Sequence, residues 1–225
     1  ALAFNWLRNA GHKIPQDVEE KLLVYLYGLT RRSTLPDFYT AGMASSVRAV
    51  ALAALAEHGK IAAEDVQRYV EHLNEMSLFG QAHLLIAALK TPGTGEAPQK
   101  IAAAILNQAN QTGGKFIFTE NIDTQYAHLL DSSLRTNCSI LSALLADKRD
   151  NPALQTETYF KLVRYITQSR GQRDYWENTQ ENMFCMNAMI DYAKRFESIK
   201  PNMTVNAAAG PAVLGTAMFA DFRDP

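Results

Sequence analysis

Four helix-length segments of this chain carry almost no charge. Residues 79–89, 136–146 and 182–190 contain no Asp, Glu, Lys or Arg, and Arg48 is the only charged residue in 40–56. A helix that is apolar or small nearly all round has no face to turn towards water, so protein must cover it on several sides. These segments are therefore predicted to be inner helices.

A second kind of helix lies between them. Apolar residues recur at helical spacing in residues 16–32, 63–76, 101–109 and 159–166, and charged residues fill the other positions. Such helices bury one side only, so they are predicted to be outer helices. The four apolar stripes are Val18, Leu22, Tyr25, Leu26 and Leu29; Val66, Tyr69, Val70, Leu73 and Met76; Ile101, Ile105, Leu106 and Ala109; and Tyr159, Leu162, Val163 and Ile166.

The alternation of the two kinds predicts the fold class. Short connections make neighbouring helices antiparallel, so inner helices pack side by side, each backed by an outer one. The prediction is an all-α chain forming part of an α/α toroid, with a helical solenoid as the alternative. Inner helices are expected to begin near residues 1, 40, 79, 134 and 178, a spacing that does not fit the 34-residue period of a tetratricopeptide array.

Two segments interrupt the helical pattern. Gly113 and Gly114 precede a short aromatic and β-branched run, which predicts a turn and a short strand. Pro201 ends the last helix, and residues 203–205 and 213–222 are predicted to be two strands. Residues 1–200 are thus expected to be a toroid domain whose N-terminal part is missing, and residues 201–225 to be strands of an adjoining β-domain.

Composition excludes several partners and leaves the compartment open. The 22 basic and 23 acidic residues give a net charge of -1, which favours no nucleic-acid partner. No apolar run approaches the ~20 residues of a membrane span, and no signal peptide is recognisable, so the chain is expected to be a fragment of a longer protein. Cys138 and Cys185 are too far apart for a Cys-x-x-Cys site and are predicted to be two buried thiols.

Three stretches match motifs of one known protein family. Residues 76–82 are similar to a Leu-Ser-Pro-Phe-Gly-Gln-Ala segment, with Leu78 in place of Pro. Residues 131–145 are similar to the segment that leads into an inner helix. Residues 175–184 resemble a Trp-x-x-Thr-Gln-Glu-Asn-Ala motif, with Met183 in place of Ala. In these three stretches the chain resembles bacterial alpha-2-macroglobulins. The matching residues, taken as a structural signature, are Phe79, Gly80, Gln81, Trp176, Asn178, Thr179, Gln180, Glu181 and Asn182.

The resemblance implies a protease trap of the bacterial envelope. In such a protein a protease cuts a bait region elsewhere in the chain, and an exposed Cys-x-Glu-Gln thioester then acylates the attacker. This chain would be the helical domain that houses and shields the thioester. Its expected partners are target proteases and neighbouring β-domains of the full-length protein. The expected location is the periplasm or cell envelope, with a lipid anchor on the full-length protein as one means of retention.

The chain lacks the family's reactive groups. Cys138 is followed by Ser-Ile-Leu and Cys185 by Met-Asn-Ala, so neither begins a Cys-x-Glu-Gln motif. The acyl-carrying His of eukaryotic relatives would fall near residues 35–40, which contain no His. No catalytic, thioester, metal or cofactor residue is therefore assigned, and no covalent or hydrolytic activity is expected of this chain.

The remaining candidate groups favour structural roles. The five histidines have no metal-ligand spacing, and His83 is predicted to be a hydrogen-bonded core residue. Glu120, Asp123 and Asp131 are predicted to be solvated loop acids. The alternative for these acids is a glycoside hydrolase or polysaccharide lyase, since those enzymes also use α/α toroids and paired carboxylates. Such an enzyme would show an aromatic-lined cavity with two facing carboxylates.

Overall fold

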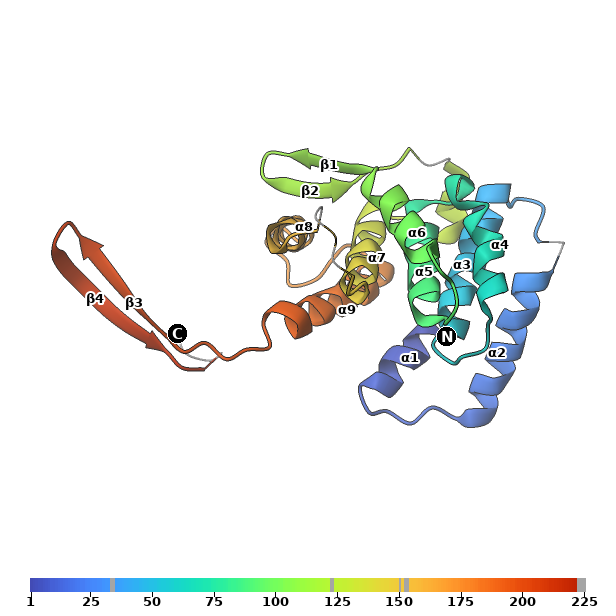
Figure 1. Ribbon diagram of the computed structural model, residues 1–225, viewed down its shortest axis with the longest axis horizontal. Coiled ribbons are helices and arrows are strands. Elements are labelled where there is room, and N and C mark those ends of the chain that lie inside the picture. The colour runs from blue at the N-terminus through green and yellow to red at the C-terminus, as the bar shows by residue number, and fades with distance from the viewer. Residues whose placement is uncertain (33–34, 122–123, 150, 152–153, 222–225) are drawn as a thin grey trace.

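The computed structural model describes residues 1–32, 35–121, 124–149, 151 and 154–221 (Figure 1). Within the described residues there are five inner helices: α1 (Leu2–Asn9), α3 (Ala41–Ala56), α5 (Leu78–Lys90), α7 (Ser133–Ala146) and α9 (Thr179–Phe196). The outer helices are α2 (Gln16–Arg31), α4 (Ala63–Val70), α6 (Ala97–Leu106) and α8 (Thr156–Gln168). Short 3₁₀ turns span Leu73–Glu75 and Thr124–Leu129.

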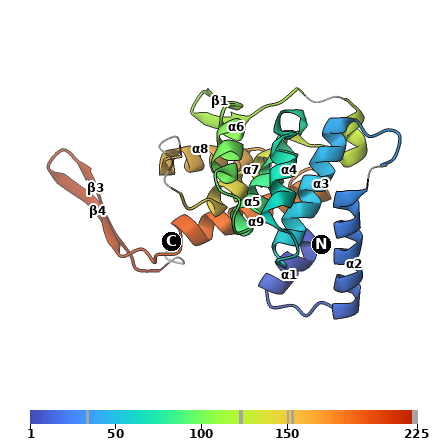
Figure 2. The same ribbon diagram turned by 45° about the vertical axis from the view of Figure 1, so that its right-hand side comes forward.

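The charge-poor helices form one continuous inner row. Helices α3, α5, α7 and α9 lie side by side in that order, α4, α6 and α8 cover the row, and α2 lies against α3 (Figures 1 and 2). The predicted inner segments 79–89, 136–146 and 182–190 fall within α5, α7 and α9, and the segment 40–56 corresponds to α3 with Thr40 as its N-cap. The predicted fold class, a two-layered helical chain with a short β segment, is confirmed.

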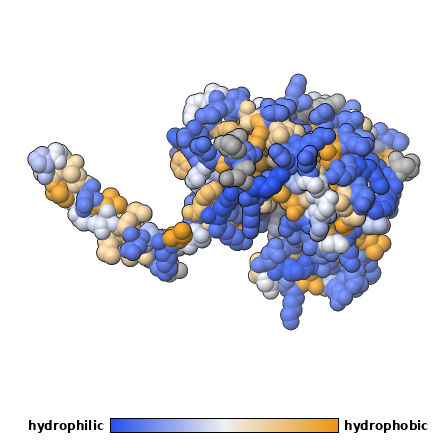
Figure 3. Space-filling model, viewed as in Figure 1, coloured by the Kyte–Doolittle hydropathy of each residue, from blue (hydrophilic) through white to orange (hydrophobic). Residues whose placement is uncertain are grey.

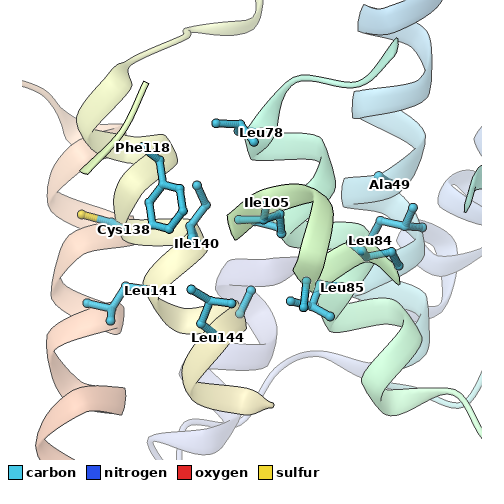
Figure 4. Packing of buried hydrophobic residues seen from close by; sticks show 14 of the residues in the cluster. Ala49, Leu78, Leu84, Leu85, Ile105, Phe118, Cys138, Ile140, Leu141 and Leu144 are labelled. Carbon is cyan, nitrogen blue, oxygen red and sulfur yellow. The ribbon is translucent and has the colours of Figure 1, made fainter. Parts of the chain in front are cut away.

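The core lies between the two layers, where α5 and α7 are covered most completely. Fully buried residues from α5, α6, α7 and the strand that precedes α7 meet there (Figure 4). Each apolar side chain moved from water into this core stabilises the fold by about 1.5–3 kcal/mol. The residues labelled there include Leu84, Leu85, Ile105, Phe118, Ile140, Leu141 and Leu144.

Contacts that skip one helix show that the inner row is curved. The ring of Phe184 on α9 lies 5.2 Å from that of Phe79 on α5, although α7 stands between the two helices. Helix α1 lies within the curve, because Trp6 contacts Phe184 at 5.5 Å and Asn5 bonds His58 beyond the end of α3 at 2.9 Å. The row therefore wraps around α1, as a segment of a toroid would.

Glycines allow two of the closest backbone approaches. A Cβ placed on Gly80 would lie 2.8 Å from both the Cα and the Oγ of Ser46, so α5 packs directly against α3 at this point. A Cβ on Gly42 would lie 2.2 Å from the carbonyl oxygen of Glu75. Small residues on the charge-poor helices thus set the spacing of the inner row.

Two hairpins accompany the helices. Strands β1 (Ala109–Thr112) and β2 (Lys115–Phe118) turn at Gly113 and Gly114, both with positive φ, and β2 packs against α7 and α8. Strands β3 (Met203–Ala209) and β4 (Ala212–Phe219) form an antiparallel pair that projects from the helical body (Figures 1 and 3). Both predicted strands are present, but the first runs on to Ala209 and the second ends at Phe219, while residue 222 lies outside the described residues.

Three helix predictions need correction. Helix α2 is less buried than its apolar stripe predicts. Val18 and Tyr25 are exposed, and the buried residue of this helix is Thr30. The 63–76 helix ends at Val70 and continues as a turn and a 3₁₀ segment, while Ala109 belongs to β1. Met186 and Ile190 are exposed on α9, since that helix ends the row.

The prediction of two buried thiols is wrong. Cys138 on α7 and Cys185 on α9 form a disulfide, with their Cα atoms 4.9 Å apart. The two residues are 47 positions apart in sequence, and the packing of α7 against α9 brings them together. Periodicity predicts that both helices are inner but not that these two residues share a level, which is why the sequence did not reveal the bond.

The Gly80 contact gives a direct test of the inner packing. We expect Gly80→Ala to lower the free energy of unfolding by about 1–3 kcal/mol, because the added methyl meets the backbone of Ser46. Gly28→Ala in α2 is the matched control, since nothing lies within 4 Å of its added Cβ. That change should stabilise the protein by up to about 1 kcal/mol through helix propensity. Urea denaturation measures both, and equal effects would contradict the close approach of α3 and α5.

Candidate functional site

The N-termini of the four row helices share one feature. Thr40, Ser77, Ser132 and Asn178 each accept a bond from a backbone N–H in the first turn of α3, α5, α7 and α9, at 3.2, 3.2, 3.4 and 3.0 Å. Helices α2, α6 and α8 have no such side-chain bond. The first N–H groups of a helix need partners, and in an inner helix protein must supply them in place of water.

Bonds between neighbouring helix starts join these caps into a network, here called the N-terminal rim. The hydroxyls of Ser46 and Ser77 lie 3.1 Å apart and link α3 to α5. The Leu78 N–H at the start of α5 donates to Oε2 of Glu120 at 2.7 Å. The hydroxyl of Ser132 donates to the Glu181 carboxylate and links α7 to α9. The rim consists of Thr40, Ser46, Ser77, Glu120, Asp131, Ser132, Arg135, Asn178 and Glu181.

The signature residues between 176 and 182 form the turn that leads into α9 and its first helical turn. Asn178 caps the helix, and the Glu181 carboxylate accepts from the Glu177 N–H at 3.1 Å. Asn182 accepts from the Trp176 N–H and donates to the Trp176 carbonyl, both at 3.0 Å. Asn178 therefore supplies the side-chain cap of α9, and the Glu181 carboxylate bonds the residue before that cap.

Trp176 anchors this entry to the outer layer. Its side chain is 5% exposed, and its indole N–H donates to the carbonyl oxygen of Ile166 near the end of α8 at 3.0 Å. The predicted burial of Trp176 at the start of the last inner helix is confirmed. Thr179 is exposed and Gln180 half-buried, and neither side chain bonds another residue in the described ranges.

The signature residues Phe79, Gly80 and Gln81 lie in the first turn of α5 and fix its position. Phe79 contacts Phe184 and lies beneath the Arg135 guanidinium, which is 4.0 Å from its ring centre. Gln81 donates to the carbonyls of Leu73 and Met76 at 3.1 and 3.3 Å, so it fixes the turn before the helix. Two sets of contacts join the signature residues of α5 to those of α9. Phe184 contacts Phe79, while Ser132 bonds Glu181 and Arg135 covers Phe79. The structural role of the signature residues remains a prediction, and these contacts support it.

The prediction of solvated loop acids is wrong for Glu120 and Asp131, and Asp123 lies outside the described residues. Both described acids are partly buried in the rim. Burial raises the pKa of Glu120 to about 7; the bond from the Leu78 N–H opposes this rise, and the charge of Asp131 adds to it. Burial also raises the pKa of Asp131, against the charge of Arg135 3.4 Å away. These acids leave solvent because the segment before α7 folds over the helix starts.

Arg135 is the rim residue that the sequence did not single out. It is 4% exposed, donates to the Leu129 carbonyl at 2.9 Å and pairs with Asp131, while burial lowers its pKa. The sequence did contain one signal for a buried arginine, because Arg135 stands directly before the charge-free segment 136–146. Its planar cation stacks on Phe79 and offsets part of the cost of burying two carboxyl groups nearby.

His83 is the core histidine that was predicted. It is 2% exposed, and its Nδ1 lies 2.8 Å from the Phe79 carbonyl oxygen. Burial lowers its pKa to about 4, with the Phe79 carbonyl opposing the change and Arg135 reinforcing it. The ring is therefore neutral at neutral pH.

A cavity of about 640 Å³ lies inside the curve of the inner row, between α1, α5, α7 and α9. Trp6 and Phe184 line its apolar part. Its carboxylates are both engaged, because Glu57 pairs with Lys90 at 2.5 Å and Asp191 accepts from Ser142 at 2.9 Å. Each carboxylate is thus held by a partner of its own, and no contact between the two described carboxylates is seen, so the cavity offers no specific support for a glycoside-cleaving site.

Two further features were sought in the part of the chain that the structure describes. No three His, Cys, Asp or Glu side chains gather closely enough to hold a metal ion there. No described helix combines the length and apolar content that crossing a membrane requires.

The fold of this chain is similar to that of several solved structures. Native alpha-2-macroglobulin from Escherichia coli, spanning domain MG7 to the C-terminus, matches 97% of this chain with a TM-score of 0.65 and 20% identity. Salmonella alpha-2-macroglobulin reacted with methylamine matches 94% with a TM-score of 0.63 and 19% identity. Trypsin-activated alpha-2-macroglobulin from Escherichia coli matches 94% with a TM-score of 0.57 and 24% identity.

This chain has the fold of part of a bacterial alpha-2-macroglobulin. It spans 32%, 12% and 13% of those three chains, so the relatives contain much that this chain does not. No family model matches the sequence, and no curated protein does. The resemblance inferred from the three sequence stretches is confirmed, and at these identities it establishes the fold alone.

The burial of Trp176 makes the α9 entry testable. We expect Trp176→Ala to lower the free energy of unfolding by about 3–5 kcal/mol, through lost burial and a residual cavity. Trp176→Phe is the control that keeps an apolar ring but leaves the Ile166 carbonyl without its donor, at a smaller cost of about 1–3 kcal/mol. Chemical denaturation measures both. A loss below about 1 kcal/mol for the Ala variant would assign the indole to the surface instead.

Glu120 should make stability depend on pH. Its folded pKa of about 7 lies above the ordinary value of 4.5, so the folded protein retains a proton that the unfolded chain releases between these values. The Glu120 contribution to the free energy of unfolding is therefore full below about pH 4.5 and is lost as the pH rises through about 7.

The measurement compares wild type with Glu120→Gln by urea denaturation at about pH 5 and about pH 8. As the pH rises from the lower to the higher value, the free energy of unfolding of wild type should fall relative to that of the variant. The opposite dependence from His83, whose pKa is lowered, is common to both proteins and cancels in the comparison. A difference that is the same at both pH values would show that Glu120 is solvated after all.

Proposed function

We propose that this chain is the helical thioester-type domain of a larger bacterial envelope protein that traps proteases. The observation that carries the proposal is the match to bacterial alpha-2-macroglobulins over 94–97% of the chain in all three of the comparisons above. One of those relatives is described as trypsin-activated and another as reacted with methylamine. Trypsin is a protease and methylamine opens thioesters, so both treatments fit the proposed trap.

In the proposed protein this chain shields the thioester and does not carry it. Both cysteines are engaged in the Cys138–Cys185 disulfide, so neither supplies a thiol, and neither is followed by Glu-Gln. A thioester must stay dry until it is triggered, because water would hydrolyse it. A domain with a continuous apolar row and fully capped helix starts is suited to excluding water from a neighbouring group.

The proposed envelope location has support from the disulfide. Structural disulfides persist in the periplasm and outside the cell, and they are rare in the reducing cytosol. The bond joins two inner helices in the core, where it is 0% exposed at both cysteines. This feature favours an oxidising compartment, which the cysteine spacing alone left open.

The β3–β4 hairpin supports the proposed division at about residue 200. Both strands are exposed along nearly their whole length, including Val205, Val213, Leu214 and Met218. A two-stranded hairpin with no covering layer is marginally stable in water. We therefore infer that these strands pair with an adjoining β-domain of the full-length protein.

The function is tested on the full-length protein that contains this chain. After incubation with trypsin, the protease should co-elute with the protein on size exclusion. It should still hydrolyse a small chromogenic peptide but not a large protein substrate, because a trapped protease is caged rather than blocked. Trypsin with its active-site serine blocked is the control, since it cannot cut a bait region and should elute free. Trypsin that cleaves the protein yet elutes free and fully active would refute the proposal.

The 225-residue chain alone supplies the complementary test. Methylamine should release no thiol, and incubation with trypsin should give no crosslinked product. Its intact mass should lie about 2 Da below that of the reduced chain, which corresponds to one disulfide and no lost ammonia. Incorporation of methylamine at a Gln would overturn the assignment of the thioester to another part of the protein.

A further inference from the structure

A basic pocket lies between helices α2, α3 and α4, beside the part of the N-terminal rim at the start of α3, because Ala41, Ala44 and Ser45 line it. Its volume is about 390 Å³, and Figure 2 shows the three helices next to one another. Arg31 and Arg32 enter it from the end of α2, Arg48 from α3, and Arg68 from α4. Tyr69 and His72 complete the wall beside α4.

The positive charge of this pocket is largely uncompensated. Arg31 pairs with Asp65 at 2.9 Å, and His72 lies 3.5 Å from Glu75. Arg32, Arg48 and Arg68 have no carboxylate partner among the described residues. The Arg32 guanidinium lies 5.4 Å from the centre of the Tyr25 ring, so Arg48 and Arg68 are the lining arginines with neither a carboxylate nor a ring partner among the described residues. Four arginines around one small pocket repel one another, and a bound anion would offset that repulsion.

Arg48 is held in place but keeps a free donor. One terminal nitrogen donates to the Arg32 carbonyl at 2.5 Å, while its Nε is buried and has no hydrogen-bond partner among the described residues. A buried donor without a partner is costly, so a ligand acceptor at this position would stabilise the site.

The backbone oxygens that would repel an anion are already covered. The Tyr69 hydroxyl donates to the Thr30 carbonyl at 2.8 Å, and Arg48 covers the Arg32 carbonyl. Burial raises the pKa of Tyr69, and the positive charges of Arg48, Arg68 and Arg31 oppose this rise. Apart from Glu75, which also lines the pocket and lies beside His72, the wall therefore presents donors and positive charge to the cavity.

From this arrangement we propose that the α2–α3–α4 pocket binds a phosphate-bearing ligand. Guanidinium groups match tetrahedral oxyanions with two parallel N–H donors each, and several together favour a multiply charged phosphate over a single carboxylate. A pocket of about 390 Å³ suits a small phosphorylated group rather than an extended acidic polypeptide. The phosphate can come from a free small molecule or from a lipid headgroup.

The test uses inorganic pyrophosphate, citrate and lipid vesicles with the full chain. Calorimetry should show pyrophosphate binding that weakens as salt is raised, and citrate should bind less tightly. Arg68→Gln and Arg48→Lys should each weaken pyrophosphate binding about tenfold or more, because the first removes a charge and the second removes the Nε donor. Arg164→Gln on the exposed face of α8 is the matched control and should leave binding unchanged.

Vesicles of phosphatidylcholine with and without phosphatidic acid distinguish the two sources. Binding to phosphatidic acid that Arg68→Gln abolishes would support the site with a headgroup as its source, and binding to pyrophosphate alone would support it with a soluble one. Arg68 is exposed, so its variant tests the pocket even where Arg48→Lys lowers the unfolding midpoint. The proposal is overturned by the absence of binding to either probe, by equal loss in Arg164→Gln, or by citrate binding as tightly as pyrophosphate.

Discussion

Helices α3, α5 and α7 must be covered on several sides, because they have almost no charged residues to turn towards water. That requirement produces the row of α3, α5, α7 and α9 and the outer layer that backs it. It also explains the small residues at the contacts, since Gly80 against Ser46 lets two helix backbones approach closely enough to exclude water. Where the row ends, at α9, the cover ends too, and Met186 and Ile190 remain exposed.

Burying whole helices creates a second demand at their N-termini. Each helix start has backbone N–H groups without partners, and an inner helix cannot satisfy them with water. The rim answers this with Thr40, Ser77, Ser132 and Asn178 as caps and with Glu120 and Glu181 as bridging acceptors. The residues that make this chain resemble bacterial alpha-2-macroglobulins are concentrated here, which connects the family signature to a physical need of the fold.

The disulfide stabilises the same inner row by a different mechanism. Closing a loop between residues 47 positions apart removes conformational freedom from the unfolded chain, worth about 4 kcal/mol by the chain-entropy relation. The contribution lies between α7 and α9, next to the exposed end of the row. The bond thus protects the helix with the least cover on its outer side, and it links the stability of the fold to an oxidising compartment.

The sequence by itself determined the two kinds of helix and their order, because burial of a whole helix and burial of one stripe leave different periodic patterns. It also located the Trp176 entry, since a large apolar residue before a capping sequence has few alternatives. Only the tertiary structure decided which residues face each other across helices: the Cys138–Cys185 pair, the burial of Glu120 and Asp131, the Arg135–Phe79 stack and the convergence of four arginines. Periodicity records which face of a helix is buried, but the level at which two helices meet depends on packing between segments far apart in the chain.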